Sequence, residues 1–199
     1  MREFILRALK AKTSPEFSLN DLPGTGGRMD LVCRSISNAL FIAGDMRRDT
    51  VIHAVLEGPK FPPKIVSFYG ERLKSVAPDE RNIASHIQKA LESGIDLKLR
   101  EEKEVSPGIK VAKKSFEELV KEKSKTSQLI YLNPKGKDIR EFKFNKDVCF
   151  ILSDHIGMPR QSEKFLKKFI SKVISLGQIT YLASHVIVIV HNELDRRRI

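Results

Sequence analysis

Three stretches decide the fold of this chain: LIYLNPKG (residues 129–136), VCFILSDHIGMP (148–159) and VISLGQIT (173–180). Each begins with a short apolar run and ends in a turn that contains glycine or proline, which is the pattern of a buried strand followed by a loop. The ends of parallel strands meet at one edge of a sheet, and ligands of open α/β sheets bind at that edge. The last third of the chain is therefore predicted to form a ligand site.

Composition limits the class of protein. The chain has 199 residues, of which 41% are hydrophobic and 31% charged, so it can bury a full core; we expect a single domain over 1–199, with a small hairpin extension near 97–112. The absence of an apolar run of about 20 residues and of a signal-peptide pattern predicts no membrane segment and a cytoplasmic location. Cys33 and Cys149 lie in apolar runs without metal-ligand spacing, so we expect two buried thiols and no metal.

The charge of the chain indicates its class of partner. Lys and Arg number 36 against 25 Asp and Glu, which gives a net charge of +11. Such an excess favours a polyanion, RNA or DNA, although a solvated basic surface is the alternative. Some of these basic residues are candidates for lining an RNA groove, with a solvated face again as the alternative: Lys164, Lys167, Lys168, Lys172 and the tail 196–198.

Strand and helix patterns alternate along the chain, which predicts an α/β fold with a sheet that is at least partly parallel. Strands are expected at 2–9, 50–56 and 65–68, an exposed hairpin at 101–111, and helices at 30–43, 78–91, 115–123 and 161–172. The segment 181–196 is ambiguous, because its VIVIV core (186–190) favours a strand while its apolar residues also follow a helical stripe.

Several short motifs together resemble the archaeal tRNA pseudouridine N1-methyltransferases, the TrmY family. They are RMDL (28–31), RRD (47–49), DHIGMP (154–159), SLG (175–177), LASH (182–185) and HNELD (191–195). The resemblance spans nearly the whole chain. It implies a SPOUT-type α/β fold, with a mostly parallel sheet flanked by helices and a C-terminal trefoil knot whose loops hold S-adenosylmethionine. It also implies a helix after the knot and a homodimer that acts on pseudouridine 54 in the T-loop of tRNA.

The resemblance places the cofactor in the three loops. The implied cofactor-binding residues are Leu132, Gly157, Ser175, Leu176, Gly177, Gln178, Ile179, Leu182, Ala183 and Val186. Glycines allow close backbone approach to a ligand, and apolar side chains could enclose an adenine ring, although single glycines are more often only turns. Val186 stands where many relatives are expected to carry cysteine.

Methyl transfer to a ring nitrogen requires alignment of donor and acceptor and removal of one proton, and needs no metal. Asp30 is the candidate base or orienter, although a carboxylate at a helix start often serves only the helix. Arg28 and Arg34 could hold phosphate or the uracil oxygens and Asn38 could hydrogen-bond the base, while His155 is expected to be structural. Arg47 and Arg48 complete a candidate phosphate patch, the alternative being a solvated surface.

The predicted function is therefore N1-methylation of pseudouridine 54 in tRNA with S-adenosylmethionine as donor. Two alternatives stay open. The chain could methylate a pseudouridine in ribosomal RNA, as related enzymes of the same superfamily do. It could also be a non-catalytic RNA-binding scaffold, which would bind RNA in a salt-sensitive way without turnover.

Overall fold

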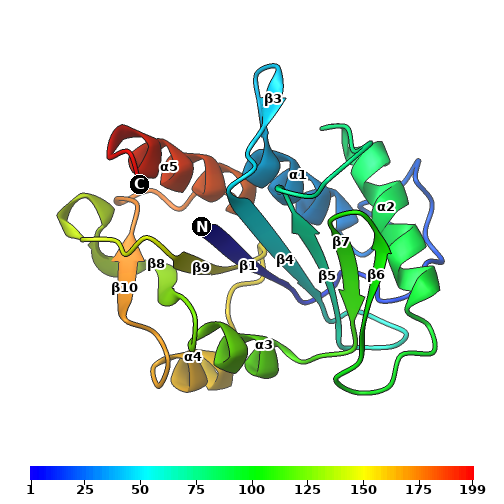
Figure 1. Ribbon diagram of the computed structural model, residues 1–199. Helices are drawn as coiled ribbons and strands as arrows, with labels where there is room; N and C mark the ends of the chain where they lie inside the picture. Colours follow the sequence, from blue (N-terminus) through cyan, green and yellow to red (C-terminus); the bar gives the residue numbers. More distant parts are fainter.

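An eight-stranded sheet runs through the computed structural model, which describes residues 1–199 (Figure 1). Its order is β10 (Lys172–Ser175), β8 (Gln128–Asp138), β9 (Val148–Ser153), β1 (Arg2–Ala8), β4 (Thr50–Leu56), β5 (Lys64–Tyr69), β7 (Ile109–Ala112) and β6 (Glu102–Ser106). The first five strands pair in parallel, and the last three add in antiparallel fashion. The predicted α/β class with a mostly parallel sheet is confirmed.

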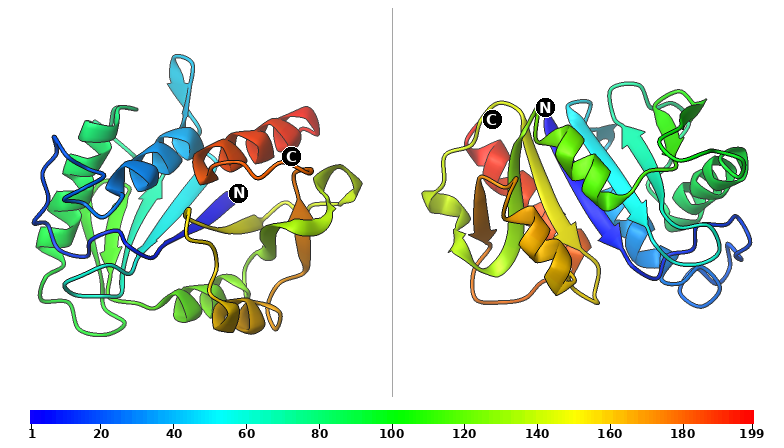
Figure 2. Two further views of the ribbon diagram at one scale, coloured as in Figure 1. Left: turned by 180° about the vertical axis from the view of Figure 1, so that it is seen from behind. Right: turned by 90° about the horizontal axis from the view of Figure 1, so that it is seen from below.

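Helices cover both faces of this sheet (Figure 2). One face carries α1 (Met29–Leu40), α2 (Glu80–Ser93) and α5 (Ala183–Arg196), and the other carries α3 (Phe116–Lys123) and α4 (Arg160–Leu166). Side chains of a strand alternate between faces, so Phe4 and Leu6 of β1 pack with α1 whereas Ile5 packs with α3 and α4. None of the helices has the length and apolarity that crossing a membrane would require.

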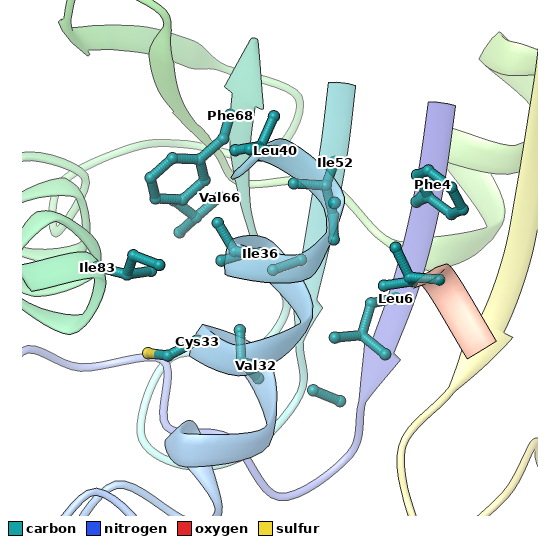
Figure 3. Close-up of a cluster of buried hydrophobic side chains, with 14 of the residues drawn as sticks. Phe4, Leu6, Val32, Cys33, Ile36, Leu40, Ile52, Val66, Phe68 and Ile83 are labelled. Atoms are coloured by element: carbon teal, nitrogen blue, oxygen red, sulfur yellow. The ribbon is translucent and has the colours of Figure 1, made fainter. Parts of the chain in front are cut away.

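The larger core lies between the sheet and α1 (Figure 3). Val32 and Ile36 of α1 are buried there with strand residues such as Phe4 and Ile52, and Cys33 is buried on the side of α1 toward Ile83 of α2. Cys149 is buried on the opposite face. Both thiols are free and inaccessible, as predicted, and burial raises their pKa values.

Helix starts follow the local signals in the sequence. At α2, the carboxylate of Asp79 accepts a hydrogen bond of 2.8 Å from the backbone N–H of Asn82, directly after Pro78. At α3, Ser115 and Glu118 form a capping box, in which each side chain accepts from the backbone N–H of the other residue. Such contacts satisfy the amides that a helix N-terminus leaves unpaired. These starts agree with the predicted ones to within two residues.

Several predicted boundaries are wrong. The first helix ends at Leu40 instead of residue 43, because the chain turns into a small hairpin, β2 (Phe41–Ile42) and β3 (Asp45–Met46), around Gly44 at φ 76°. The helix α4 ends at Leu166, and residue 172 already begins β10. The predicted hairpin at 101–111 is present as β6–β7, which continues the sheet: β6 is its exposed edge strand, and β7 is largely buried.

The strand β8 also runs further than the sequence predicted. It does not end at the turn 133–136 but continues to Asp138, followed by a short 3₁₀ helix, Ile139–Glu141. Its pairing with β10 jumps, however, from Tyr131 opposite Val173 to Lys137 opposite Ile174. Residues 132–136 therefore bulge out of the ladder and form a loop within the strand.

The ambiguous C-terminal segment is a helix, as the family resemblance implied. Ile187, Val190 and Leu194 of α5 are fully buried in the same core as α1. Two side-chain bonds join the helices: Asn38 Nδ2 donates to the carbonyl of Ser184 at 3.0 Å, and His191 Nε2 lies 3.0 Å from the carbonyl oxygen of Ala39. Packing of this stripe overrides the strand propensity of the β-branched residues.

Candidate active site

A cavity of about 590 Å³ opens at the carboxyl ends of the parallel strands. Its wall comes from the bulge of β8, the loop after β9, the segment between β10 and α5, the start of α1 with the loop before it, and the end of β1. The predicted convergence of three loops at one sheet edge is thus confirmed. Such an edge leaves backbone groups free for a ligand.

Eight of the ten residues expected to bind a cofactor lie in this wall. They are Leu132, Gly157, Leu176, Gly177, Ile179, Leu182, Ala183 and Val186. Ser175 lies just outside the wall and is buried; its Oγ donates to the carbonyl of Gly177 at 2.9 Å and accepts from the N–H of Gly177 at 3.1 Å. Gln178 is exposed and outside the wall. Ser175 therefore fixes the backbone of the third loop at Gly177 and does not itself line the cavity.

Two glycines and two apolar side chains give the wall its shape. Gly157 has φ 87° and Gly177 has φ 120°, values that other residues rarely adopt, and a Cβ at either position would meet no atom within 4 Å. The side chains of Ile179 and Leu182 are 65% and 50% exposed. Open space along the backbone beside uncovered apolar side chains fits a ligand with a flat apolar ring such as adenine.

The loop after β9 is fixed by Asp154. Its Oδ2 accepts from the N–H of Leu9 at 2.9 Å, its Oδ1 accepts from the N–H of Ile156 at 3.0 Å, and its own N–H donates to the carbonyl of Arg7 at 2.9 Å. The loop that carries Gly157 is thereby tied to the end of β1. His155, expected to be structural, is instead exposed at the cavity wall.

A polar part of the wall escaped the sequence analysis. The hydroxyl of Tyr131 donates to Glu163 at 2.9 Å and accepts from Asn133 Nδ2 at 3.2 Å. Burial and the carboxylate of Glu163 together raise the pKa of Tyr131 to about 12, so it stays protonated. A signal was present in the sequence, because Tyr131 and Asn133 flank Leu132 and Glu163 is the lone carboxylate of the basic segment 160–172.

Asp30 lies at the start of α1 and holds two arginines. Arg28 binds it through two hydrogen bonds, Nε to Oδ1 at 3.0 Å and Nη2 to Oδ2 at 3.1 Å, and Arg34 also contacts Oδ2. Burial would raise the pKa of Asp30, but the hydrogen bond and charge of Arg28 and the charge of Arg34 lower it. The carboxylate is thus ionised and fully engaged, and Arg28 itself lines the cavity.

Three other predicted substrate contacts lie away from the cavity. Arg47 pairs with Asp195, Nη2 to Oδ2 at 2.6 Å, and Arg48 donates to the carbonyls of Gly70 and Leu73, each at 3.0 Å. Asn38 is engaged with α5. The structure therefore joins Asp30 and Arg34 to Arg28, which alone of the three lines the cavity, and gives Asn38, Arg47 and Arg48 partners within the fold.

Comparison with known proteins agrees with this architecture. A family model described as "Putative SAM-dependent RNA methyltransferase" matches residues 1–199. A tRNA (pseudouridine(54)-N(1))-methyltransferase of Methanococcus maripaludis strain C6 is 44% identical over 200 residues, which cover 98% of this chain and 99% of the relative. Two further proteins of the same name are also 44% identical. The match to the protein of Methanocaldococcus jannaschii covers 100% of this chain and 98% of the relative. The match to the protein of Thermococcus kodakarensis covers 98% of this chain and 99% of the relative.

A solved structure shares the fold. Nep1 of Archaeoglobus fulgidus, bound to S-adenosylhomocysteine, matches with a TM-score of 0.67 over 98% of each chain at 15% sequence identity. The full-length family match and the three relatives confirm the resemblance that the sequence motifs indicated. The chain therefore belongs to the family of SAM-dependent RNA methyltransferases that includes the archaeal tRNA (pseudouridine(54)-N(1))-methyltransferases.

Proposed function

We propose that this protein transfers the methyl group of S-adenosylmethionine to N1 of pseudouridine 54 in tRNA. One observation carries the proposal: the chain is 44% identical, along 98% of its length, to an enzyme named for this reaction. The cavity at the sheet edge gives the cofactor a place. The excess of 36 basic over 25 acidic residues suits a tRNA substrate.

The three loops supply the cofactor site in this proposal. Leu132, Ile179 and Leu182 provide apolar contacts for the adenine, and Gly157 and Gly177 leave room along the backbone. Glu163, the carboxylate held by Tyr131, suits the ammonium group of the methionine part. S-adenosylmethionine, when bound, supplies an electrophilic methyl group on its sulfonium. These residues align that group with the acceptor nitrogen.

Arg28, which is bonded through Asp30 to Arg34, acts in this proposal on the acceptor base. N1 of pseudouridine carries a proton that must pass to water as the methyl group arrives, and a nearby cation favours the deprotonated ring. Arg28 lines the cavity and can supply that cation to the uracil oxygens. Asp30, ionised and bonded to Arg28 and Arg34, acts in this scheme as the orienter and not as the base.

A competition between RNA substrates tests the proposal. Purified protein with labelled S-adenosylmethionine is offered a tRNA and a small-subunit ribosomal RNA fragment, each carrying pseudouridine. We expect label on the tRNA alone. Label on the ribosomal fragment alone would assign the other substrate, and tight tRNA binding without label on either would support the scaffold alternative.

Two finer features belong to the same proposal. We infer a trefoil knot at the bulge of β8, because the consecutive residues Val173 and Ile174 of β10 pair with Tyr131 and Lys137 on either side of it, so that residues 132–136 form a loop beside β10. We also infer a homodimer, because apolar residues at α5 are left exposed and a second copy of the chain would cover them. Tyr181, just before α5, is 41% exposed, and Val188, on α5, is 48% exposed. Sedimentation analysis distinguishes a dimer from a monomer. The cytoplasmic location stays a prediction.

A further inference from the structure

The segment that contains α4 carries positive charges without partners. Five cations occur between residues 160 and 172, all exposed: Arg160, Lys164, Lys167, Lys168 and Lys172. None of these five side chains forms an ion pair, although many arginines and lysines elsewhere in the fold do. Glu163, the one carboxylate of the segment, accepts the hydroxyl of Tyr131 on the cavity side. The outer face of the segment is therefore uncompensated.

The neighbouring helix does not neutralise these charges either. The helix α3 packs beside α4 and contains three glutamates, but each faces another cation. Glu117 lies 3.9 Å from Arg7, Glu118 lies 2.8 Å from Arg100, and Glu122 lies 2.6 Å from Lys114.

The same helix adds a further cation. The ammonium of Lys121 lies over the ring of Phe165 on α4, 5.9 Å from its centroid. We call the six residues Lys121, Arg160, Lys164, Lys167, Lys168 and Lys172 the α4 cation surface.

In the C-terminal tail 196–198, the other basic candidate, the middle arginine has partners within the fold. Arg197 is bonded to Glu193, to the carbonyls of Phe142 and Ile139, and lies 5.3 Å from the ring centroid of Phe144. That guanidinium holds the C-terminus to the fold. Arg196 and Arg198 are exposed and form no ion pair, but they lie at the end of α5, whose first residues line the cavity.

The α4 cation surface lies beside the candidate active site. Met158, just before α4, and Glu163, on its inner side, both line the cavity. Figure 2 shows α4 on the sheet face opposite α1 and α5, next to β8, β9 and β10. An RNA that inserts a base into the cavity would bring its flanking phosphates to the rim that α4 forms.

We propose that the α4 cation surface binds the phosphate backbone of the tRNA beside the nucleotide in the cavity. Exposed lysines suit phosphates, since they act as mobile point charges that position a backbone without reading bases. Binding releases counterions, so affinity falls with salt in proportion to the phosphates contacted. This inference rests on the proposed function for the identity of the RNA.

The test compares two triple variants that remove the same charge. One is Lys164→Gln, Lys167→Gln, Lys168→Gln. The control is Arg81→Gln, Lys89→Gln, Lys103→Gln, three exposed cations without ion pairs near the opposite edge of the sheet. Binding of tRNA is measured across a salt series, binding of S-adenosylmethionine by calorimetry, and folding by thermal unfolding. A Lys→Arg version of the α4 triple shows whether charge alone suffices.

The expected result is specific to α4. Loss of three phosphate contacts lowers the slope of log affinity against log salt by about 2 to 3, so between about 50 and 200 mM salt the wild type loses roughly 30-fold more affinity than the α4 triple. The control keeps the wild-type slope, the arginine version restores it, and cofactor affinity is unchanged in all.

Equal slopes of log affinity against log salt for the two glutamine triples, or no tRNA binding by the wild type, would contradict the proposed role of the α4 cation surface. Failure of the proposed function is distinct: a protein that binds tRNA through α4 but transfers no methyl group leaves the surface in place.

Discussion

Gly157 offers a sharp test of the cofactor site, because the chain contains a matched control. Gly157 has φ 87° and lines the cavity; Gly44 has φ 76° and lies in the β2–β3 hairpin away from the cavity. A Cβ at either position would meet nothing within 4 Å. Substitution by leucine therefore strains the backbone similarly at both sites, but only at residue 157 does the new side chain enter the cavity.

The magnitudes follow from this difference. A non-glycine residue in the left-handed region costs about 1 to 2 kcal/mol, which for a chain of this size lowers the melting temperature by about 2 to 8 °C in both variants. We expect Gly157→Leu to weaken S-adenosylmethionine at least tenfold, about 1.4 kcal/mol, and Gly44→Leu to leave its affinity within about twofold of the wild type. Calorimetric titration and thermal unfolding measure both. Equal cofactor affinity in the two variants would refute the placement of the cofactor against Gly157.

Three further substitutions test other parts of the site and fold. Asp30→Asn removes the charge that orients Arg28. We expect kcat/KM to fall roughly 30-fold, which corresponds to about 2 kcal/mol of transition-state stabilisation, with cofactor affinity unchanged. An unaffected kcat/KM would contradict the role of Asp30 as orienter. Glu163→Gln should weaken S-adenosylmethionine about tenfold through loss of a charged hydrogen bond, whereas Glu117→Gln should not; equal affinities would contradict the role of Glu163. Burial and two nearby arginines lower the pKa of His191 from 6.5 to about 4, so the unfolded chain gains a proton first as the pH falls through this window. The free energy of unfolding should drop there by about 3 kcal/mol, and by less in His191→Gln; urea titrations with equal drops would contradict this.

Local sequence patterns were sufficient to locate the cavity that is the candidate ligand site. An apolar run that ends in glycine or proline marks a buried strand and its exit, and parallel strands bring their exits together. Gly157 and Gly177 came from this reasoning together with the family resemblance, and both lie in the cavity wall. The same reasoning placed the turn at 133–136 at a strand end, because a bulge within a continuing strand has no distinct local pattern.

Contacts between distant segments were beyond the sequence. Arg47 resembles a free phosphate ligand until its partner Asp195, 148 residues away, is seen beside it. Tyr131 and Glu163 are likewise joined only by the fold. The helix α5 shows the same limit, since its β-branched core favours a strand and only burial against α1 decides the conformation.

The central claim is the identity of the methylated atom, and one measurement tests it directly. Two tRNA transcripts that differ only in uridine or pseudouridine at position 54 are incubated with the protein and S-adenosylmethionine, digested, and analysed by nucleoside mass spectrometry. N1 of uridine is the glycosidic nitrogen and has no proton to lose, so only the pseudouridine transcript should gain a methyl group, as N1-methylpseudouridine. Methylation of both transcripts, or of another nucleoside, would contradict the account.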